Sequence, residues 1–460
     1  MTSLWLAVLI AGMMPVAGLL AGVLRWPRDF FASLLYVQAL MYLFVAPAVV
    51  AADLTQSAQA RYGYFLWWGL GLFSIPFVLV YRLILAACER YWSVRVNLRV
   101  RAWPSVAFAA GTLLLGAGYL FVALTRNLLY RRLGSDGLAG AQLDLPLLEL
   151  AFYRGFMELA PFLSMFSLLV LRVPSPMDAS MRTLWRITLF FSAVVYGLHV
   201  LVNSRVWGVL FVTSLAGIVL LTGNRSRPHR PERAVLVLLI GLLGLYQLKV
   251  TENVRERIAS GGNALDPANL LIGQRSSVAE DGYTWRLNGV DLMALIADNV
   301  EAQGPALGRA WAVPLLLSMD PVIRTDATEQ LKRAALTTSK SFLLLQYAGI
   351  AQMDYYSCML TDAYGNFGVG GFLAVALVLA AVCAFTTACF SGAQRPALMV
   401  VSCFALSRVL PFEQEFSALL FGWLKLTPLL LVIIVFNPLS VRAKRDVRAA
   451  VSDGLLPVTV

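Results

Sequence analysis

The chain has 460 residues, of which 59% are hydrophobic and 14% are charged, and its mean hydropathy is +0.72. Soluble globular domains carry about 25% charged residues, so the composition excludes a soluble domain and indicates an integral membrane protein. The formal net charge of +11 could suggest a nucleic-acid partner. However, the excess lies in short loops beside apolar stretches, a distribution that is typical of membrane proteins and excludes a nucleic-acid-binding face.

Eleven apolar stretches predict an all-α polytopic membrane protein, since a helix needs about 20 residues to cross the bilayer. The first lacks the basic segment and small-residue cleavage site of a signal peptide, so we expect it to be retained as a helix. The predicted spans are 3–24, 30–51, 62–86, 103–125, 155–172, 184–202, 206–222, 233–250, 366–391, 397–411 and 416–437.

Basic residues between these stretches fall on alternate loops. Loops rich in Lys and Arg face the cytoplasm, so the pattern predicts a periplasmic amino terminus and a cytoplasmic carboxy terminus. The basic loops hold Arg25 and Arg28; Arg82, Arg90, Arg95, Arg99 and Arg101; Arg172, Arg182 and Arg186; Arg225, Arg227, Arg230 and Arg233; and Arg442, Lys444, Arg445 and Arg448.

One long polar segment, residues 251–345, lies on the side away from the basic loops. It divides the chain into a first group of spans (1–250), the large outer loop (251–345), and the last spans with a basic tail (346–460). Residues 290–296 and 310–317 are predicted to form short amphipathic or partly buried helices within the loop. Loops of this length are usually functional, so we expect the site there and at the helix ends beneath it.

The hairpin between the sixth and seventh spans is the first candidate site. Arg205 begins a helix on the outer side, where an arginine is costly unless it reaches the headgroups or binds an anion. Asn203 and Ser204 are good helix caps, and an arginine beside a helix amino terminus can bind phosphate. The alternative is an interfacial anchor. His199 is a candidate base, with a hydrogen-bonded core histidine as its alternative.

The outer loop supplies further cations, of which Arg286 directly precedes a predicted apolar helix. Outer loops need not be basic, so these arginines favour an anionic ligand, although a solvated loop surface is the alternative for each of them. The candidates for binding a diphosphate or an acidic sugar are Arg205, Arg275, Arg286 and Arg324.

Two carboxylates precede the ninth span. Asp354 and Asp362 lie at the predicted outer boundary of the membrane, where a carboxylate is unfavourable unless it is paired or has a use. Either could deprotonate a sugar hydroxyl. Glu413 and Glu415, on the last outer loop, are alternative bases.

The sequence excludes several other kinds of site. It has only two histidines, and no pair of its five cysteines has metal-binding or redox spacing, so we expect no metal centre. No phosphate-binding glycine-rich loop and no hydrolase motif occurs in a credible context. We therefore expect no cofactor and no nucleotide-dependent chemistry.

The layout resembles that of the oligosaccharide repeat-unit polymerases of bacterial surface polysaccharides, the Wzy-type O-antigen polymerases. The resemblance covers roughly residues 180–390, and the order of its motifs is more specific than any one of them. The motifs are Asn203-Ser204-Arg205, Arg286-Leu287-Asn288-Gly289-Val290-Asp291 and Tyr364-Gly365-Asn366-Phe367-Gly368.

The resemblance implies a metal-independent glycosyltransferase of the bacterial inner membrane. It would polymerise oligosaccharide repeat units carried on undecaprenyl diphosphate into an O-antigen or exopolysaccharide on the periplasmic side. Arg205 and Arg286 would match the outer-face arginines of the family. The partners would be the lipid-linked oligosaccharides and the bilayer, with a chain-length regulator as a further candidate. An odd number of spans departs from the twelve drawn for many members.

Three other readings stay open at the level of sequence. An O-antigen ligase-like transferase would use the same donor with another acceptor, but that family often has a histidine in its outer loop and this loop has none. A transporter or flippase of lipid-linked glycan predicts charged spans and repeated halves, and neither is clear here. A structural subunit of an export complex would have no catalytic residues.

Overall fold

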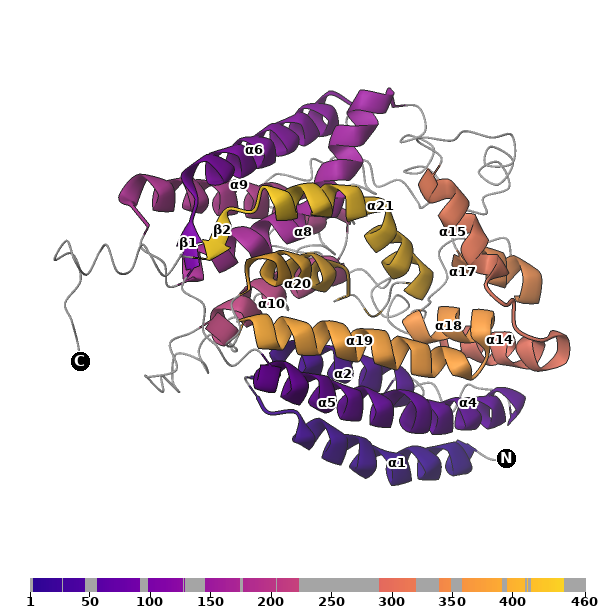
Figure 1. The fold of residues 1–460 in the computed structure, drawn as a ribbon. Helices are drawn as coiled ribbons and strands as arrows, with labels where there is room; N and C mark the ends of the chain where they lie inside the picture. Colours follow the sequence, from indigo (N-terminus) through magenta and orange to yellow (C-terminus); the bar gives the residue numbers. More distant parts are fainter. Residues whose placement is uncertain are drawn as a thin grey trace, which may run out of the picture.

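The computed structural model describes residues 3–26, 28–45, 56–91, 98–126, 128, 145–173, 177–203, 205–222, 289–319, 339–348, 358–390, 395–409, 412 and 415–441. These residues are almost entirely helical (Figure 1). In chain order the helices, including three π-helical segments η1 to η3, are α1 (Ser3–Val23), α2 (Phe30–Leu40), η1 (Met41–Val45), α4 (Gln56–Trp68), η2 (Gly69–Ser74), α5 (Ile75–Tyr91), α6 (Ala102–Thr125), α8 (Leu147–Arg172), α9 (Ala179–Asn203), α10 (Arg205–Thr222), α14 (Gly289–Gln303), α15 (Arg309–Met319), α17 (Ser339–Leu343), η3 (Leu344–Ala348), α18 (Met359–Phe367), α19 (Gly370–Ala388), α20 (Pro396–Val409) and α21 (Phe416–Val435).

Five helices in the described part of the chain are long and apolar enough to cross a membrane. Helix α21 would be a sixth if its two halves, Phe416–Leu424 and Leu426–Val435, which are bent by 49°, form one span. The span predicted at 233–250 lies outside the described residues. The five helices cover Leu6–Val23, Arg61–Tyr91, Ala102–Thr125, Leu148–Arg172 and Gly370–Ala388, and shorter apolar helices cover Phe30–Phe44, Leu210–Thr222 and Pro396–Val409.

A small sheet accompanies the mostly helical fold that the sequence predicted. Strand β1 (Leu98–Val100) pairs antiparallel with β2 (Leu439–Val441), with Leu98 opposite Val441 and Val100 opposite Leu439. Both strands alternate apolar and polar residues, as a half-buried strand does. With three residues each, they are too short for this alternation to predict a strand between long apolar helices. The pairing joins the start of α6 to the end of α21.

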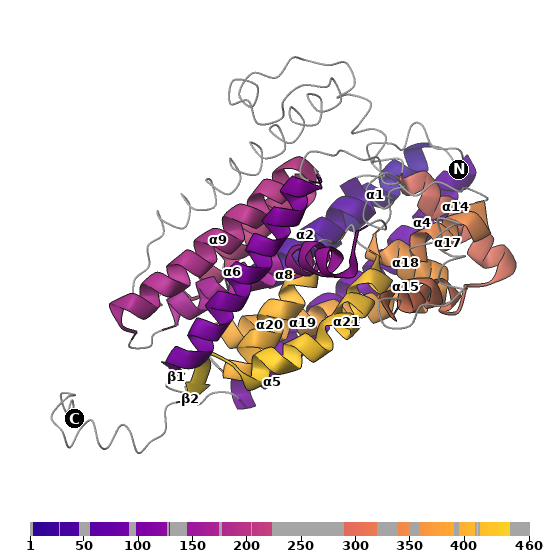
Figure 2. The same cartoon turned by 90° about the horizontal axis from the view of Figure 1, so that it is seen from above.

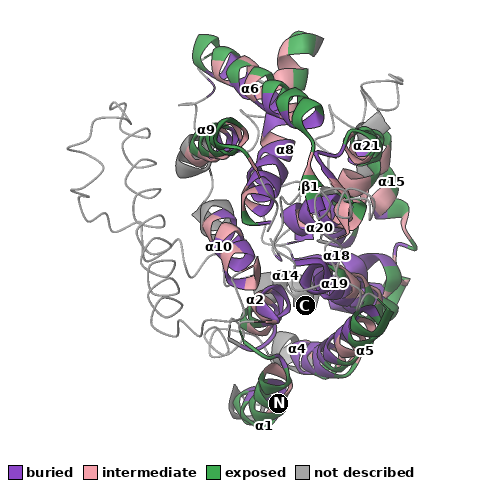
Figure 3. Ribbon diagram, turned by 60° about the vertical axis from the view of Figure 1, so that its left-hand side comes forward, coloured by how far each residue is buried: buried purple, intermediate pink, exposed green. Residues whose placement is uncertain are grey.

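Helix α19 forms the centre of the bundle, between α5 and α20 (Figure 1). Its side chains are buried on most of its circumference, whereas α1 and α6 present broad exposed faces (Figure 3). On α1, Leu19 is 74% exposed and Val8 is 62% exposed. Large exposed apolar side chains on a peripheral helix fit contact with lipid rather than water.

Described residues of the predicted basic loops after the first and third spans meet at one end of the bundle, where Arg28 pairs with Glu89. Arg82 on α5 forms an ion pair with the buried carboxylate of Asp29 at 2.8 Å, and Tyr81 donates to the same carboxylate at 2.6 Å. The backbone N–H of Arg101 donates to the carbonyl oxygen of Pro438 at 2.7 Å. We name this the basic end, defined by Arg28, Arg82, Arg90, Arg99 and Arg101.

The two short helices predicted in the long outer segment are confirmed as α14 and α15, both longer than predicted. They gather with α17 and α18 at the other end of the bundle from β1 and β2 (Figure 2). In the turn between α14 and α15, Ala306 and Leu307 donate their N–H groups to the carbonyl oxygens of Gly365 and Asn366 at 2.9 and 2.7 Å. We name this the opposite end, formed by Arg61, Arg126, α14, α15, α17 and α18.

The predicted ninth span begins later than residue 366. Asn366 belongs to the separate helix α18, and the span α19 begins at Gly370. Gly368 ends α18 with φ +60°, a conformation that favours glycine. A Cβ atom on Gly371 would lie 2.3 Å from the carbonyl oxygen of Ala363. The glycines therefore turn the chain sharply and let α19 pack closely on α18.

Candidate functional site

Asp362 occupies the centre of a buried polar cluster at the opposite end. Its side chain is 0% exposed, and both carboxylate oxygens accept hydrogen bonds. Ser339 Oγ and Asn366 Nδ2 donate to Oδ1, the latter at 3.1 Å, while the backbone N–H of Ser417 donates to Oδ2 at 2.8 Å. Asn366 Nδ2 also donates to Ser339 Oγ at 3.2 Å. The cluster therefore ties α17, α18 and α21 together.

Local sequence explains why these groups meet. Asp362 and Asn366 are four residues apart on α18 and so lie on the same face. Ser339 begins α17, and Ser417 lies in the first turn of α21. Glu415 stands at the cap position of α21 but makes no side-chain cap bond. The carboxylate of Asp362 thus caps α21 from another helix and stabilises its positive amino end.

Burial raises the pKa of Asp362 above the ordinary value of an aspartate, because water is excluded from its carboxylate. Hydrogen bonds from Ser339 and Ser417 lower this pKa, but burial has the larger effect. The indole of Trp311 on α15 also lowers this pKa, although it completes no hydrogen bond of ordinary geometry. A carboxylate without access to solvent and with both oxygens engaged is better suited to positioning helices than to removing a proton from a substrate.

An aromatic cluster covers this polar centre. The indole ring of Trp311 packs edge-on against Phe367 at 4.7 Å and against Phe416 at 5.7 Å between ring centroids. Tyr364 belongs to one of the motifs that carry the family resemblance. Its side chain is 1% exposed, and its ring stacks on that of Trp68 with 5.6 Å between the centroids. These contacts fix α15 and α18 against α4 and α21, so the short helices of the outer segment form part of the packed core.

The second polar centre is an ion pair that the sequence reasoning missed. Arg408 on α20 pairs with Glu158 on α8 at 3.2 Å, and their side chains are 16% and 25% exposed. Arg408 is also close enough to Tyr196 on α9 to act on its hydroxyl electrostatically. Glu158 falls inside a predicted span, and a carboxylate among apolar residues was the signal that could have found this site.

The two polar centres lie along the same helix. Asp362 contacts the backbone of Ser417, while an Nη1 atom of Arg408 lies 3.8 Å from the position of a Cβ atom on Gly422. Gly422 follows Ser417 by five positions in the helix, which corresponds to a rise of about 7.5 Å along α21. A carboxylate cluster and a guanidinium therefore flank the first two turns of one helix.

The first candidate site lies where α9 is followed by α10. Arg205 is the first residue of α10, and His199 lies in α9, which ends at Asn203. The side chains of His199 and Arg205 lie outside the described residues. Tyr196 connects the two helices by an edge-on ring contact with Phe211 at 4.8 Å. The helix break predicted at this hairpin is thus found, and Tyr196 of α9 lies near Arg408.

The remaining predicted site residues cannot be placed relative to these centres, because they lie outside the described residues. They are Asp354, Arg275, Arg286 and Arg324, together with the alternative base Glu413. The other alternative base, Glu415, is 9% exposed and accepts a long hydrogen bond of 3.5 Å from the hydroxyl of Ser417. Glu415 therefore borders the Asp362 cluster.

The long outer segment is held to the bundle by an ion-pair cluster. Arg61 on α4 pairs with both Asp298 and Glu301 on α14. All three side chains are between 31% and 42% exposed, so the cluster lies at the surface, where such pairs contribute little to stability. It joins α14 to α4.

No three His, Cys, Asp or Glu side chains among the described residues are grouped in a way that could hold a metal ion. Comparison with protein-family models, with curated proteins and with solved structures finds no match to this chain. The chemistry must therefore be argued from the residues themselves. They offer a guanidinium and carboxylates, partly or fully shielded from water, at one end of a membrane bundle.

Proposed function

We propose that this chain is a membrane glycosyltransferase that polymerises oligosaccharide repeat units carried on undecaprenyl diphosphate. The observation that carries the proposal is the partly buried Arg408–Glu158 pair beside the buried Asp362 cluster, at the end of the bundle away from the basic loops. A lipid diphosphate donor is anchored in the bilayer with its charge at the surface. A cation at helix ends is the group that would bind it.

The proposed orientation puts the opposite end in the periplasm of a bacterium and the basic end in the cytoplasm. Eleven spans with a periplasmic amino terminus and a cytoplasmic carboxy terminus follow from the alternation of basic loops. The ion pair of Arg28 with Glu89 supports this alternation, because it joins the predicted basic loops that follow the first and third spans. The inner membrane is the one in which such a donor is available.

In the reaction, a hydroxyl oxygen of the acceptor sugar attacks the anomeric carbon of the donor glycan. The bond from that carbon to the diphosphate oxygen breaks, the hydroxyl proton passes to a base, and undecaprenyl diphosphate leaves. Arginines stabilise the charge that develops on the leaving group. We assign this role to Arg408 together with Arg205, Arg275, Arg286 and Arg324.

The candidates for the base are Asp354, His199 and Glu158. Glu158 is added because it is partly exposed and adjoins the guanidinium that would hold the leaving group. Asp362 is proposed instead as a positioning residue, because it has no exposed surface. Its task is to hold α21, and with it the surroundings of Arg408, in place.

The test is the length of the surface polysaccharide made by cells carrying Ala variants of Arg205, Arg286 or Arg408. We expect long polysaccharide to be lost while the single-repeat product persists. Arg126→Ala is the matched control, since Arg126 lies at the same end in an exposed pair with Glu149. An unchanged chain length would contradict the catalytic assignment, and failure of single repeats to reach the outer leaflet would favour a transporter.

A further inference from the structure

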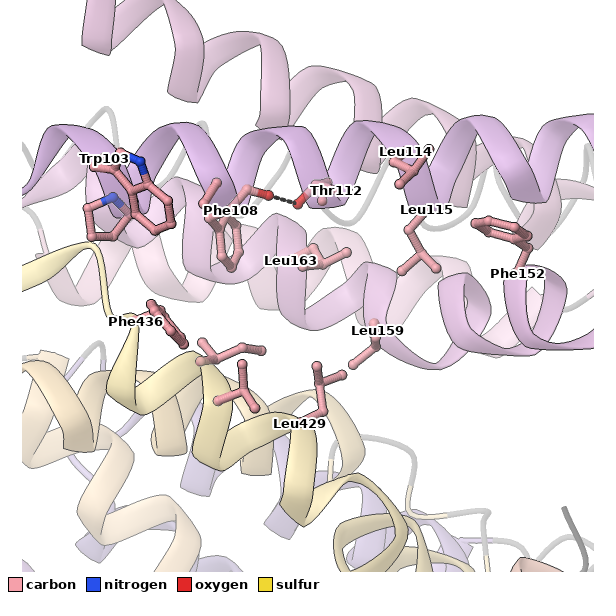
Figure 4. Close-up of a pocket in the computed structure, with 15 residues that line it drawn as sticks. Trp103, Phe108, Thr112, Leu114, Leu115, Phe152, Leu159, Leu163, Leu429 and Phe436 are labelled. Atoms are coloured by element: carbon pink, nitrogen blue, oxygen red, sulfur yellow. Dashed lines mark hydrogen bonds between the residues drawn. The ribbon is translucent and has the colours of Figure 1, made fainter. Parts of the chain in front are cut away.

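An apolar groove runs between α6, α8 and α21, separate from both polar centres (Figure 4). Its volume is about 550 Å³, within the range of about 300–1,000 Å³ that is usual for ligand pockets. The one hydroxyl in its wall, that of Thr112, already donates to the carbonyl oxygen of Phe108 at 2.8 Å. The groove therefore offers a ligand almost entirely apolar contacts.

The length and depth of the groove fit one leaflet of a bilayer. Its wall on α6 runs from Trp103 to Leu115, which is about 18 Å along a helix. Half of a hydrocarbon core of about 30 Å is about 15 Å. Because α6 and α8 are candidate membrane spans, the groove lies at the depth of lipid chains. Trp103 is 70% exposed and Phe436 is 52% exposed, so the wall is open to the bilayer.

Two arginines stand at the basic end of this groove. Arg99 lies in β1 and Arg101 directly precedes α6, two residues before Trp103. Side chains two residues apart in an extended strand point to the same side, so both guanidinium groups share one face. Both residues are exposed. Neither pairs with a carboxylate among the residues that the structure describes, whereas Arg28 and Arg82 at the same end pair with Glu89 and Asp29.

The other end of the groove is bounded by packed aromatic rings. Leu115 and Phe152 line that end and pack on a cluster that contains Tyr119, Tyr153 and Phe156. The Tyr119 ring stacks on Tyr153 and Phe156 at centroid distances of 5.3 and 5.0 Å. A chain in the groove is therefore expected to enter from the basic end.

We propose that the groove binds an acyl chain of an anionic phospholipid, drawn from the leaflet at the basic end, with its phosphate held by Arg99 and Arg101. The apolar wall selects a hydrocarbon chain, and the two unpaired guanidinium groups select a negative headgroup over a zwitterionic one. This lipid holds α6 and α8 against the second half of α21. The proposal does not depend on the transferase reaction, which uses the other end of the bundle.

The test is native mass spectrometry of the full chain released from nanodiscs that contain equal amounts of phosphatidylglycerol and phosphatidylcholine. We expect retained phosphatidylglycerol to exceed phosphatidylcholine for the unchanged protein. Arg99→Gln with Arg101→Gln should lower that ratio by up to about thirtyfold, as two membrane-surface arginines are removed. Arg90→Gln with Arg182→Gln is the matched control, because it removes two exposed arginines outside the groove and should leave the ratio unchanged.

A second pair of variants tests the groove itself. Gly111→Leu should displace the chain and lower total lipid retention, because a Cβ atom at Gly111 meets nothing within 4 Å and the new side chain would fill the groove. Ala107→Leu serves the same purpose if the first variant does not fold. Gly12→Leu on α1, where a Cβ atom also meets nothing, is the control. Undiminished retention in both groove variants, an unchanged ratio in the arginine variant, or displacement of phosphatidylglycerol by undecaprenyl phosphate would overturn the proposal.

Discussion

The Oδ2 atom of Asp362 accepts the backbone N–H of Ser417 at 2.8 Å, so a carboxylate on α18 caps the amino end of α21. The same helix carries Gly422, beside which the guanidinium of Arg408 lies. Movement of α18 would therefore move the surroundings of Arg408. This connection gives Asp362 a role in the proposed site that requires no contact with substrate.

Replacement of Asp362 by alanine should destabilise the protein by at least about 2 kcal/mol, because buried donors on Ser339, Asn366 and Ser417 lose their acceptor. Thermal unfolding of the purified protein in detergent measures the effect. Ser417→Ala keeps the backbone N–H that Asp362 accepts, so it should cost much less. Equal costs for the two variants would show that the cap contributes little.

The stability of the protein should depend on pH through Asp362. Its raised pKa means that the folded state binds the proton more tightly than the unfolded chain. The contribution of this proton is present in full below the ordinary Asp pKa of about 3.9 and is lost as pH rises through the higher folded value. The Tm of the unchanged protein minus that of Asp362→Asn should therefore fall from about pH 4 upward. Asp178→Asn, at an exposed carboxylate before α9, is the control, and a difference independent of pH would contradict this expectation.

Gly371→Ala should separate α18 from α19. The added Cβ atom would meet the carbonyl oxygen of Ala363 at 2.3 Å, and backbone atoms cannot yield as a flexible side chain can. We expect a loss of about 1–3 kcal/mol in thermal unfolding and a shorter polysaccharide. Gly370→Ala is its neighbour and control, since a Cβ atom there meets nothing within 4 Å. Equal losses of stability in the two variants would show that the close approach of Gly371 to Ala363 does not matter for the fold.

Periodicity and charge predicted much of the helical layout. The alternation of basic loops anticipated that the loops after the first and third spans would lie at the same end, where Arg28 pairs with Glu89, because charge distribution at helix ends is set locally in the sequence. Helices α14 and α15 were also anticipated from their apolar spacing. The β1–β2 pairing was not, because it joins residues about 340 positions apart and such pairing leaves little trace in one sequence.

The candidate site was predicted less well. Asp362 was predicted as a catalytic base, and the sequence could not show that its hydrogen-bond partners would be Ser339 and Ser417, which come from helices distant in the chain. The Arg408–Glu158 pair joins residues 250 positions apart. Tertiary packing alone brings such groups together, and composition indicates only that a carboxylate inside an apolar span needs a partner.

Arg408 and Glu158 should be energetically coupled. Both side chains are largely shielded from water, so a double-mutant cycle with Arg408→Ala and Glu158→Ala should give a coupling of about 1 kcal/mol in thermal unfolding. The exposed pair of Arg126 and Glu149 is the matched cycle and should couple more weakly. Coupling no greater than in that control would mean that the buried pair is incidental to the fold.

The side of the membrane on which the opposite end lies can be tested with cysteines. All five native cysteines are buried, so a membrane-impermeant maleimide should not label the unchanged protein. Ala302→Cys places a thiol at the exposed end of α14, and Arg90→Cys places one in the exposed last turn of α5. With the outer membrane permeabilised, we expect Ala302→Cys to be labelled in intact cells and Arg90→Cys only after lysis. Labelling in the reverse order would put Arg408 in the wrong leaflet for a periplasmic donor and would end the transferase proposal.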